Sequence, residues 1–364
     1  MQSEPQEVSR VKCLQDILLQ KGMDAFLITD IVNVRYLSGF TGSSGEIILT
    51  PLAAYFITDG RYIQQAEEEI TGQTHRSAPT FELIRSKEPL SETLNNFFVN
   101  KYNIRRLGIE AENLTYHQYQ VLSEKLDFLQ LVPTEKMILE LRRIKSDDEI
   151  QKIRMACKIA HQVFNELLPM IKPGISEIDL LCELEYKIKK NGGQVAFEPI
   201  IASGVRSSLP HARASSRVIQ AQEPLLIDWG VGYEGYNCDI TRMIVPDDVS
   251  CKFQEMYHAV KETQVRVIKM LKPGIKFDEI NEAGKNILTQ FGYGDFWSHK
   301  IGHGIGLEVH EGLGGNGEAV LMSGMVMTIE PGAYIPQMGG ARVEDTVLIT
   351  DDGCEVLTGG IRKA

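Results

Sequence analysis

The sequence predicts a two-domain α+β protein. A smaller α/β domain (residues 1–135) precedes a larger domain (residues 136–364) that is built from two copies of one α-α-β-β unit. Three observations indicate this fold class. The chain has 364 residues, which is long for a single hydrophobic core. Short β-rich runs follow one another in its first part. Lys172-Pro173-Gly174-Ile175 then recurs as Lys272-Pro273-Gly274-Ile275, at a shift of 100 residues, which indicates an internal duplication.

The composition is ordinary for a soluble globular protein, with 43% hydrophobic and 24% charged residues. The formal net charge of −11 argues against a nucleic-acid partner, because such partners need a basic surface. No apolar run reaches the roughly 18 residues of a membrane helix, so we expect no membrane association. The start carries no signal-peptide pattern, and the six cysteines form no C-x-x-C pair. We therefore expect a cytoplasmic protein without a disulfide framework.

The first domain contains three short runs typical of strands, Asp24–Thr29, Glu46–Thr50 and Ala54–Thr58. Between the first two lies Ser38–Gly45, a segment with three glycines. Its glycine spacing matches no phosphate-binding loop or dinucleotide fingerprint, so it is predicted to be a plain turn.

The larger domain begins its first unit with a helix at Ser146-Asp147-Asp148-Glu149. This is a capping box, in which the serine hydroxyl and the glutamate carboxylate satisfy free N–H groups of the first turn. Pro173-Gly174 ends the first helical segment, and Pro273-Gly274 ends its counterpart in the second unit. The apolar stripes of the two helices are Ile150, Ile153, Cys157, Ala160, Phe164 and Leu167, and Phe253, Met256, Val260, Val267 and Leu271.

Strands that carry acidic residues are predicted after the helices of each unit. In the first unit, Leu225–Gly230 and Asn237–Arg242 flank a Gly-Tyr-Glu-Gly turn at 232–235 and suit an antiparallel hairpin in which Asp228 and Asp239 face one another. In the second unit, Met327–Glu330 and Arg342–Asp345 flank Gly339-Gly340 in the same way.

The duplication relates these acids in pairs. Asp228 matches Glu330 at a shift of 102 residues, and Asp239 matches Glu344 at a shift of 105. A single strand carboxylate is more often a solvated surface charge. Here apolar runs precede Asp228 and Glu330 and would bury their acids, and buried acids need partners or metal ions. Four carboxylates from two facing halves predict a site for two divalent ions.

Two histidines lie in the glycine-rich segment Gly302–Glu311. A lone histidine is more often structural than functional, but the three glycines allow a close approach of the backbone to a ligand. His211 in the first unit also lies beside His310 at a shift of 99 residues. His303 and His310 are therefore predicted to belong to the site. His299 has no counterpart in the first unit, and we expect a structural role for it.

Taken together, these motifs resemble the pita-bread metallopeptidases, the group of aminopeptidase P, prolidase and methionine aminopeptidase. The motifs are Leu209-Pro210-His211, Asp228-x-Gly230, Asp239-Ile240-Thr241-Arg242, Gly302-His303-Gly304, His310-Glu311, Glu330-Pro331-Gly332 and Arg342-Val343-Glu344-Asp345. The first domain, through Asn33–Phe40 and Thr58–Tyr62, resembles the N-terminal domain of creatinase and the Xaa-Pro peptidases. The resemblance implies a pita-bread catalytic domain with an internal pseudo-twofold repeat, preceded by a creatinase-like α/β domain.

The resemblance also implies residue roles, a cofactor and a reaction. The ligands of two divalent ions per subunit would be Asp228, Asp239, His303, Glu330 and Glu344. Glu330 would accept a proton from the attacking water, and His211 and His310 would contact the substrate and the reacting carbonyl. This oxygen-rich ligand set favours Mn²⁺, or Co²⁺ and Zn²⁺, over copper or iron–sulfur chemistry. The reaction would be hydrolysis of the bond between an N-terminal residue and proline, in a homodimer.

The substrate pocket is less defined by the motifs. We expect Phe197, Tyr236 and His310 to form walls for the proline ring. Prolidases usually continue the His-Glu motif with x-Pro-Arg, where the arginine can hold a dipeptide carboxylate, whereas this chain has Gly312-Leu313-Gly314-Gly315. Longer peptides are therefore expected to be cleaved at least as well as dipeptides, unless Arg342 or an arginine from a partner subunit's N-terminal domain replaces the missing one.

Three alternatives remain open at this point: a creatinase-related hydrolase, a dipeptidase with little preference for proline, and a non-catalytic peptide-binding protein of the same fold. Creatinase resembles the fold but lacks the metal ligands, all five of which are present here. Metal content and a panel of peptides distinguish these alternatives.

Overall fold

The computed structural model describes residues 6–71, 81–96, 104–313 and 319–361. The chain divides into two compact units, Met1–Leu141 and Arg142–Ala364. The boundary predicted at residues 135 and 136 falls just before α7 (Met137–Arg142), the helix in which this division lies. Within the described residues, no helix combines the length and the apolar character needed to cross a membrane.

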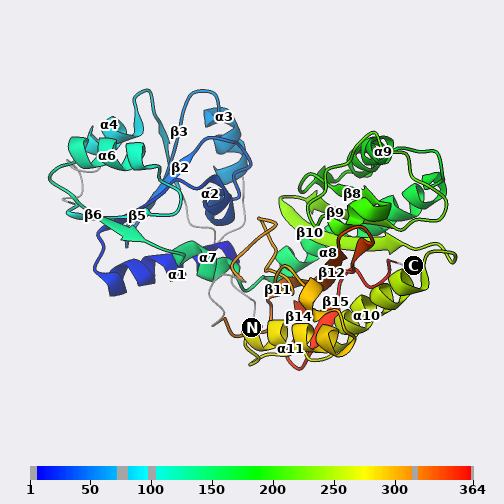
Figure 1. The fold of residues 1–364 in the computed structure, drawn as a ribbon. Coiled ribbons are helices and arrows are strands. Elements are labelled where there is room, and N and C mark those ends of the chain that lie inside the picture. The colour runs from blue at the N-terminus through cyan, green and yellow to red at the C-terminus, as the bar shows by residue number, and fades with distance from the viewer. Residues whose placement is uncertain (1–5, 72–80, 97–103, 314–318, 362–364) are drawn as a thin grey trace. The chain divides into compact units, whose positions relative to one another are not determined.

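The first unit is a six-stranded mixed sheet with the strand order β4-β3-β2-β1-β5-β6. The three predicted strands are confirmed as β1, β2 and β3. Helices α4 and α6 cover one face through a shared apolar core, and α1 and α2 lie on the other side (Figure 1). The elements are α1 (Gln6–Lys21), β1 (Ala25–Ile28), α2 (Ile31–Ser38), β2 (Glu46–Leu49), β3 (Ala54–Thr58), α3 (Ile63–Ala66), η1 (Glu67–Thr71), β4 (Glu82–Arg85), α4 (Leu90–Leu94), β5 (Arg106–Glu110), α6 (Tyr116–Lys125) and β6 (Gln130–Thr134).

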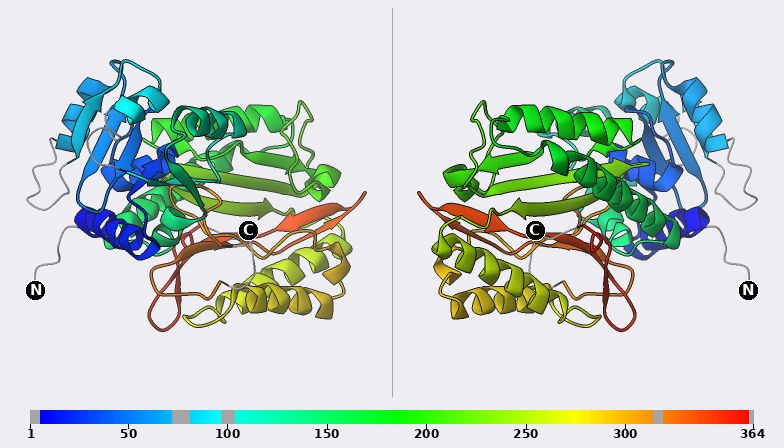
Figure 2. Two further views of the ribbon diagram at one scale, coloured as in Figure 1. Left: turned by 90° about the vertical axis from the view of Figure 1, so that its left-hand side faces the viewer. Right: turned by 90° about the vertical axis from the view of Figure 1, so that its right-hand side faces the viewer.

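The second unit contains the predicted duplication. Its first half holds α8 (Asp147–Leu167), η3 (Leu168–Met170), α9 (Glu177–Lys190), β7 (Gln194–Val195), β8 (Ile200–Ser203), η4 (Gly204–Ser208), β9 (Leu225–Tyr233) and β10 (Tyr236–Ile244). Its second half holds α10 (Cys251–Ile268), α11 (Phe277–Gln290), η5 (Gly294–Phe296), β11 (Val326–Ile329), β12 (Gly332–Ile335), β13 (Gly339–Arg342), β14 (Asp345–Ile349) and β15 (Cys354–Val356). The helices of the first half (green) and of the second half (yellow) lie on opposite sides of the strands (Figure 2).

The repeat is visible in individual turns. Gly174 and Gly274 both adopt a left-handed conformation, with φ values of 101° and 91°, which favours glycine. The Gly174 amide donates to the carbonyl of Ile219, and the Gly274 amide donates to that of Leu321, at 3.1 and 2.9 Å. The capping box at Ser146 and Glu149 is also confirmed, and the predicted apolar stripes of α8 and α10 are buried.

The first hairpin pairs β9 with β10, as predicted, but its register shifts the two acids. Thr241 lies opposite Asp228, and Gly230 lies opposite Asp239. Asp228 and Asp239 are therefore diagonal neighbours on one face of the hairpin and do not lie directly opposite one another. Diagonal neighbours still lie close enough for their side chains to interact.

The second hairpin is interrupted at its acids. Ile329 pairs with Asp345, and Gly332 pairs with Arg342 in the same register, but the ladder breaks between them at Glu330-Pro331. The predicted turn position was wrong, because Gly339-Gly340 belongs to β13. These glycines serve close packing, since a Cβ atom at Gly340 would lie 2.3 Å from the carbonyl oxygen of Ser207.

Candidate metal centre

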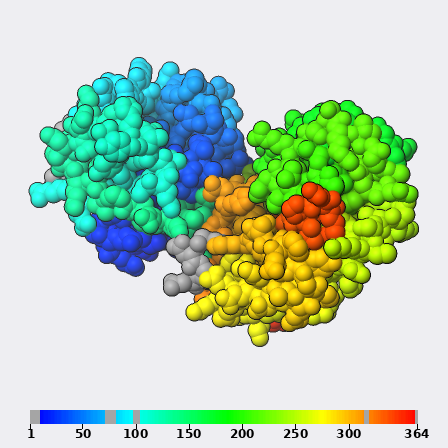
Figure 3. All heavy atoms as spheres, in the orientation of Figure 1, coloured from blue at the N-terminus to red at the C-terminus, as the bar shows by residue number. Residues whose placement is uncertain are grey.

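A cavity of about 580 Å³ lies in the second unit. Its wall combines the two hairpins with the glycine-rich segment that precedes β11. In the space-filling view, the orange to red end of the chain lies at the surface between the green and yellow halves of this unit (Figure 3). The predicted site residues that line the cavity are Phe197, His211, Asp228, Asp239, His303, His310, Glu330, Arg342 and Glu344.

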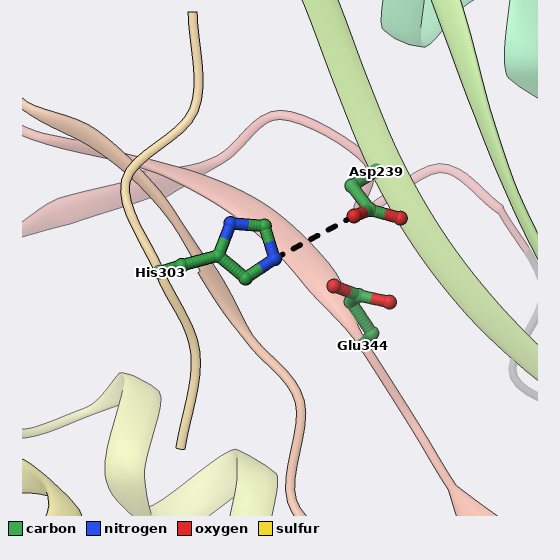
Figure 4. Close-up of side chains that lie close together, drawn as sticks. All are labelled: Asp239, His303 and Glu344. Carbon is green, nitrogen blue, oxygen red and sulfur yellow. Dashed lines mark ion pairs between the residues drawn. The ribbon is translucent and has the colours of Figure 1, made fainter. Parts of the chain in front are cut away.

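The centre of the cavity holds a group of metal-ligand side chains. Asp239 of β10, His303 and Glu344 each present one ligand atom, and these atoms all lie within 4.8 Å of one another (Figure 4). The His303 Nε2 atom is 3.6 Å from Asp239 Oδ2 and 3.7 Å from Glu330 Oε1. The fold thus brings together acids from both halves of the repeat around one imidazole.

Two carboxylate oxygens in this group have no partner. Asp228 Oδ1 and Asp239 Oδ1 are buried and accept no hydrogen bond from the described residues. An unsatisfied buried polar atom costs about 1–3 kcal/mol, and more for a charged group. A divalent cation between the carboxylates would supply the missing interaction. The orphaned oxygens therefore fit a metal site.

The charges of the acids lead to the same conclusion. Burial, and then the charge of Glu344, raises the pKa of Asp239 well above its ordinary value. Burial, and then the charge of Glu330, does the same to the pKa of Glu344. Burial raises the pKa of Glu330 to about 8, although Arg342 acts in the opposite direction. Asp239, Glu330 and Glu344 therefore ionise together only when cations compensate their charges, as two divalent ions would.

The environment of His303 favours its neutral form, which is the form that binds a metal ion. Burial, and then the neighbouring His310, lowers the pKa of His303 to about 4. The His303 Nδ1 atom lies 3.1 Å from the carbonyl oxygen of Gly304. Because a carbonyl only accepts, Nδ1 carries the proton and the Nε2 lone pair faces the acids.

The glycines around His303 are required by close packing against the protein's own backbone, whereas a close approach to a ligand was the prediction. A Cβ atom at Gly302 would lie 2.0 Å from the carbonyl oxygen of Thr328, and one at Gly304 would lie 1.9 Å from that of Glu311. The His303 amide donates to Thr328 Oγ1 at 3.0 Å. The backbone of the glycine-rich segment therefore packs directly against the backbone of β11, which places the His303 imidazole next to the acids.

Glu311 supports this segment through a buried ion cluster that the sequence reasoning did not find. Lys145 Nζ lies 2.9 Å from one Glu311 oxygen, and an Arg142 nitrogen lies 2.6 Å from the other. Burial alone would raise the pKa of Glu311, but Lys145 and Arg142 lower it below its ordinary value. The Glu311 amide also donates to the carbonyl of Gly304 at 2.7 Å. The cluster thus anchors the segment that carries His303 and His310.

The rim of the cavity carries the other predicted histidines. His211 and His310 are exposed and line the cavity, and the rings of His303 and His310 lie 4.1 Å apart between centroids. Phe197 is half-buried and contributes an apolar wall. These three side chains remain accessible to a ligand.

Arg342 lines the cavity, but its expected substrate contact is not supported. Its guanidinium group donates to Asp228, to Thr241 Oγ1 at 3.1 Å, to Tyr334 Oη at 2.8 Å and to the Pro210 carbonyl at 3.2 Å. The residue is only 3% exposed. Four of its five N–H groups are therefore bonded within the protein, which holds Asp228 in place and leaves no pair of N–H groups for bidentate binding of a substrate carboxylate.

The prediction that Tyr236 forms a pocket wall was wrong. Tyr236 donates to Glu149 Oε1 at 2.8 Å, and its ring packs in the core between α8 and the first hairpin. Successive side chains of a strand point to opposite faces, and Tyr236 is three residues from Asp239. It therefore faces away from the acids.

His299, which was expected to be structural, lies in the cavity wall. Its Nε2 atom is 2.8 Å from Tyr334 Oη, and its Nδ1 atom is 3.9 Å from Glu330 Oε2. Burial lowers the pKa of His299 to about 4. The search for repeat partners missed it because only one half of the duplication carries it. Its position four residues before His303 was the available signal.

Comparison with known proteins identifies the family. Residues 151–351 match Metallopeptidase family M24, and residues 10–144 match the Creatinase/Prolidase N-terminal domain. The chain belongs to metallopeptidase family M24. It is 36% identical over 355 residues to a Xaa-Pro dipeptidase of Pyrococcus horikoshii, and the match covers 96% of each chain.

Solved structures of M24 relatives agree over nearly the whole chain. A Xaa-Pro dipeptidase from Bacillus anthracis is 36% identical, with a TM-score of 0.90 and coverage of 97% of each chain. An X-Pro aminopeptidase from Thermotoga maritima is 32% identical, with a TM-score of 0.87 and coverage of 97% of this chain and 98% of that one. The predicted family and the predicted pita-bread fold with a creatinase-like N-terminal domain are confirmed.

Proposed function

We propose that this M24 metallopeptidase hydrolyses the peptide bond between an N-terminal residue and a following proline. The observation that carries the proposal is the group of Asp239, Glu344 and His303, with Glu330 and Asp228 in the same cavity and two orphaned carboxylate oxygens. The names of the relatives, Xaa-Pro dipeptidase and X-Pro aminopeptidase, support the preference for proline.

The five side chains of that group would hold two divalent ions. Such ions activate a water molecule for attack and polarise the scissile carbonyl. Glu330, whose oxygens face both His303 and His299, would accept the proton of the water and deliver it to the leaving proline nitrogen. Carboxylate oxygens of the group would accept hydrogen bonds from the substrate's amino terminus.

The exposed residues at the rim would bind the substrate. His310, whose ring centroid lies 4.1 Å from that of His303, would donate a hydrogen bond to the oxyanion that forms at the carbonyl. His211 would contact the peptide from the other side of the cavity. Phe197 would pack against the proline ring, whose apolar face and fixed φ suit a preformed wall.

The proposal extends to the metal, the assembly and the compartment. The oxygen-rich ligand set favours Mn²⁺ over softer ions. By family resemblance the protein would form a homodimer, and we propose that it works in the cytoplasm. Elemental analysis after purification without added metal, and the mass in solution, measure the first two directly.

A peptide panel tests the proposed reaction. Metal-loaded protein should cleave Ala-Pro or Ala-Pro-Ala at least about tenfold faster, by kcat/KM, than Ala-Ala or Ala-Ala-Ala. Equal rates on the proline and alanine series would indicate a dipeptidase without proline preference. Two bound equivalents of Mn²⁺ without hydrolysis of any of the four peptides would contradict an enzymatic function.

A further inference from the structure

The charged side chains of the cavity wall include cations as well as the central acids. Besides the four central acids, the described residues of the wall include one further acid, Glu198, and three cations, Arg213, Lys300 and Arg342. Arg342 makes four hydrogen bonds within the protein, so it has no pair of N–H groups for a ligand carboxylate. A peptide whose amino terminus approaches the acids has its carboxylate at the opposite end, where a cation is needed.

Arg213 is placed to supply that cation. His211 and Arg213 are exposed and line the cavity, whereas Ala212 between them is only 4% exposed. Both exposed side chains therefore border the same cavity, two positions apart in the chain. Arg213 thus faces the cavity beside a histidine that is proposed to contact the substrate.

The backbone on both sides of this pair is fixed. Arg342 donates to the Pro210 carbonyl at 3.2 Å, and the Arg206 guanidinium donates to the Arg213 carbonyl. Arg206 is itself held by Glu177, a fully buried acid, at 3.1 Å. A rigid segment presents its side chains at low entropic cost when a ligand binds.

The Arg213 guanidinium has no hydrogen bond or ion pair with any residue that the structure describes. Arg342 differs in this respect, since four of its five N–H groups are bonded within the protein, whereas no described residue occupies those of Arg213. A guanidinium group binds a carboxylate through two parallel N–H···O bonds, which adds geometric selectivity to charge.

We propose that Arg213 binds the C-terminal carboxylate of the substrate and makes Xaa-Pro dipeptides the preferred substrates. This inference rests on the proposed function and adds the substrate length to it. It also reverses the expectation drawn from Gly312-Leu313-Gly314-Gly315, of which Gly314 and Gly315 lie outside the described residues. The arginine that is absent after Glu311 is supplied by the other half of the repeat.

Ala-Pro and its C-terminal amide test the proposal, because the amide differs only by lacking the charge. The wild-type enzyme should prefer Ala-Pro by at least about tenfold in kcat/KM. Arg213→Gln should lower kcat/KM on Ala-Pro by roughly 10- to 100-fold, the scale of one lost charged hydrogen-bonding pair, mainly through KM. Its kcat/KM on the amide should change less than about twofold, and Arg213→Lys should retain part of the preference.

Two control variants complete the design. Arg105→Gln removes an exposed arginine of the first unit and should leave both rates unchanged. Lys300→Gln removes the other cation of the cavity wall, and a loss of the Ala-Pro preference in that variant would overturn the assignment to Arg213. Equal effects of Arg213→Gln on both substrates, or none on either, would overturn it as well. If wild-type protein with bound Mn²⁺ cleaves neither substrate, the proposed function fails and this inference fails with it.

Discussion

Replacing Glu311 by glutamine measures how much the buried ion cluster of Glu311, Lys145 and Arg142 stabilises the protein. Glutamine has nearly the same size, so the change leaves no cavity and alters only charge and hydrogen bonding. Its amide oxygen can accept from one cation, but its NH₂ group faces the other. Lys145 and Arg142 have side chains only 1% and 2% exposed, so neither can recover its interaction from water.

The size of the effect follows from this burial. Removing one partner of a buried ion pair costs about 3–5 kcal/mol, because the remaining charge is left uncompensated. Arg142 keeps a second partner, Glu308 at 2.7 Å, so Lys145 bears most of the loss. In a domain of this size each kcal/mol lowers Tm by about 2–4 °C, which predicts a decrease of about 6–20 °C.

Thermal unfolding at pH 7 in the presence of metal measures the decrease. Glu308→Gln is the matched control, because Glu308 binds the same arginine with a side chain 44% exposed, and it should cost less than about 1 kcal/mol. Folding lowers the pKa of Glu311. The stabilisation by its carboxylate is therefore fully present above the pKa that Glu311 has in the unfolded chain, and it is lost as the pH falls through the pKa in the folded protein. Equal Tm decreases for the two variants at pH 7 would refute the reasoning.

Three further predictions concern the metal centre. Glu344→Ala should lose bound metal and peptidase activity together, and two full equivalents of metal in this variant, measured by elemental analysis, would contradict the assignment. His310→Ala should keep its metal but lose roughly 10²–10³-fold in kcat/KM on an Xaa-Pro substrate, and unchanged kinetics would exclude an oxyanion contact. In the metal-free protein, the pKa values of Asp239, Glu344 and Glu330 are raised by folding. These side chains therefore keep protons in the folded protein that they release above about pH 4 in the unfolded chain, and folding becomes less favourable as the pH rises. The protein's Tm in excess chelator should therefore fall from pH 5.5 to pH 8, and a Tm that rises across this range would contradict the shifts.

The sequence alone was sufficient for features that depend on local pattern or on duplication. The capping box at Ser146, the strands of the first unit and the apolar stripes of the helices follow from short-range rules. The paired shifts of Asp228 with Glu330 and of Asp239 with Glu344 identified acids that the structure brings to one cavity. Apolar residues precede the acids in the same strands and indicate that the acids are buried. The acids could therefore be predicted, although the side chains that contact them could not.

Tertiary structure decided which neighbour each of these side chains meets. Arg342 and Arg213 are both arginines near site motifs, yet Arg342 makes four hydrogen bonds within the protein, whereas Arg213 makes none with the residues that the structure describes. Glu311 gains Lys145 and Arg142 from a segment far away in the sequence. Such contacts depend on how distant segments pack, and a local pattern carries no information about that packing. Tyr236 is an intermediate case. Once the bounds of the strand are known, strand alternation predicts that its side chain points to the other face of the sheet from Asp239.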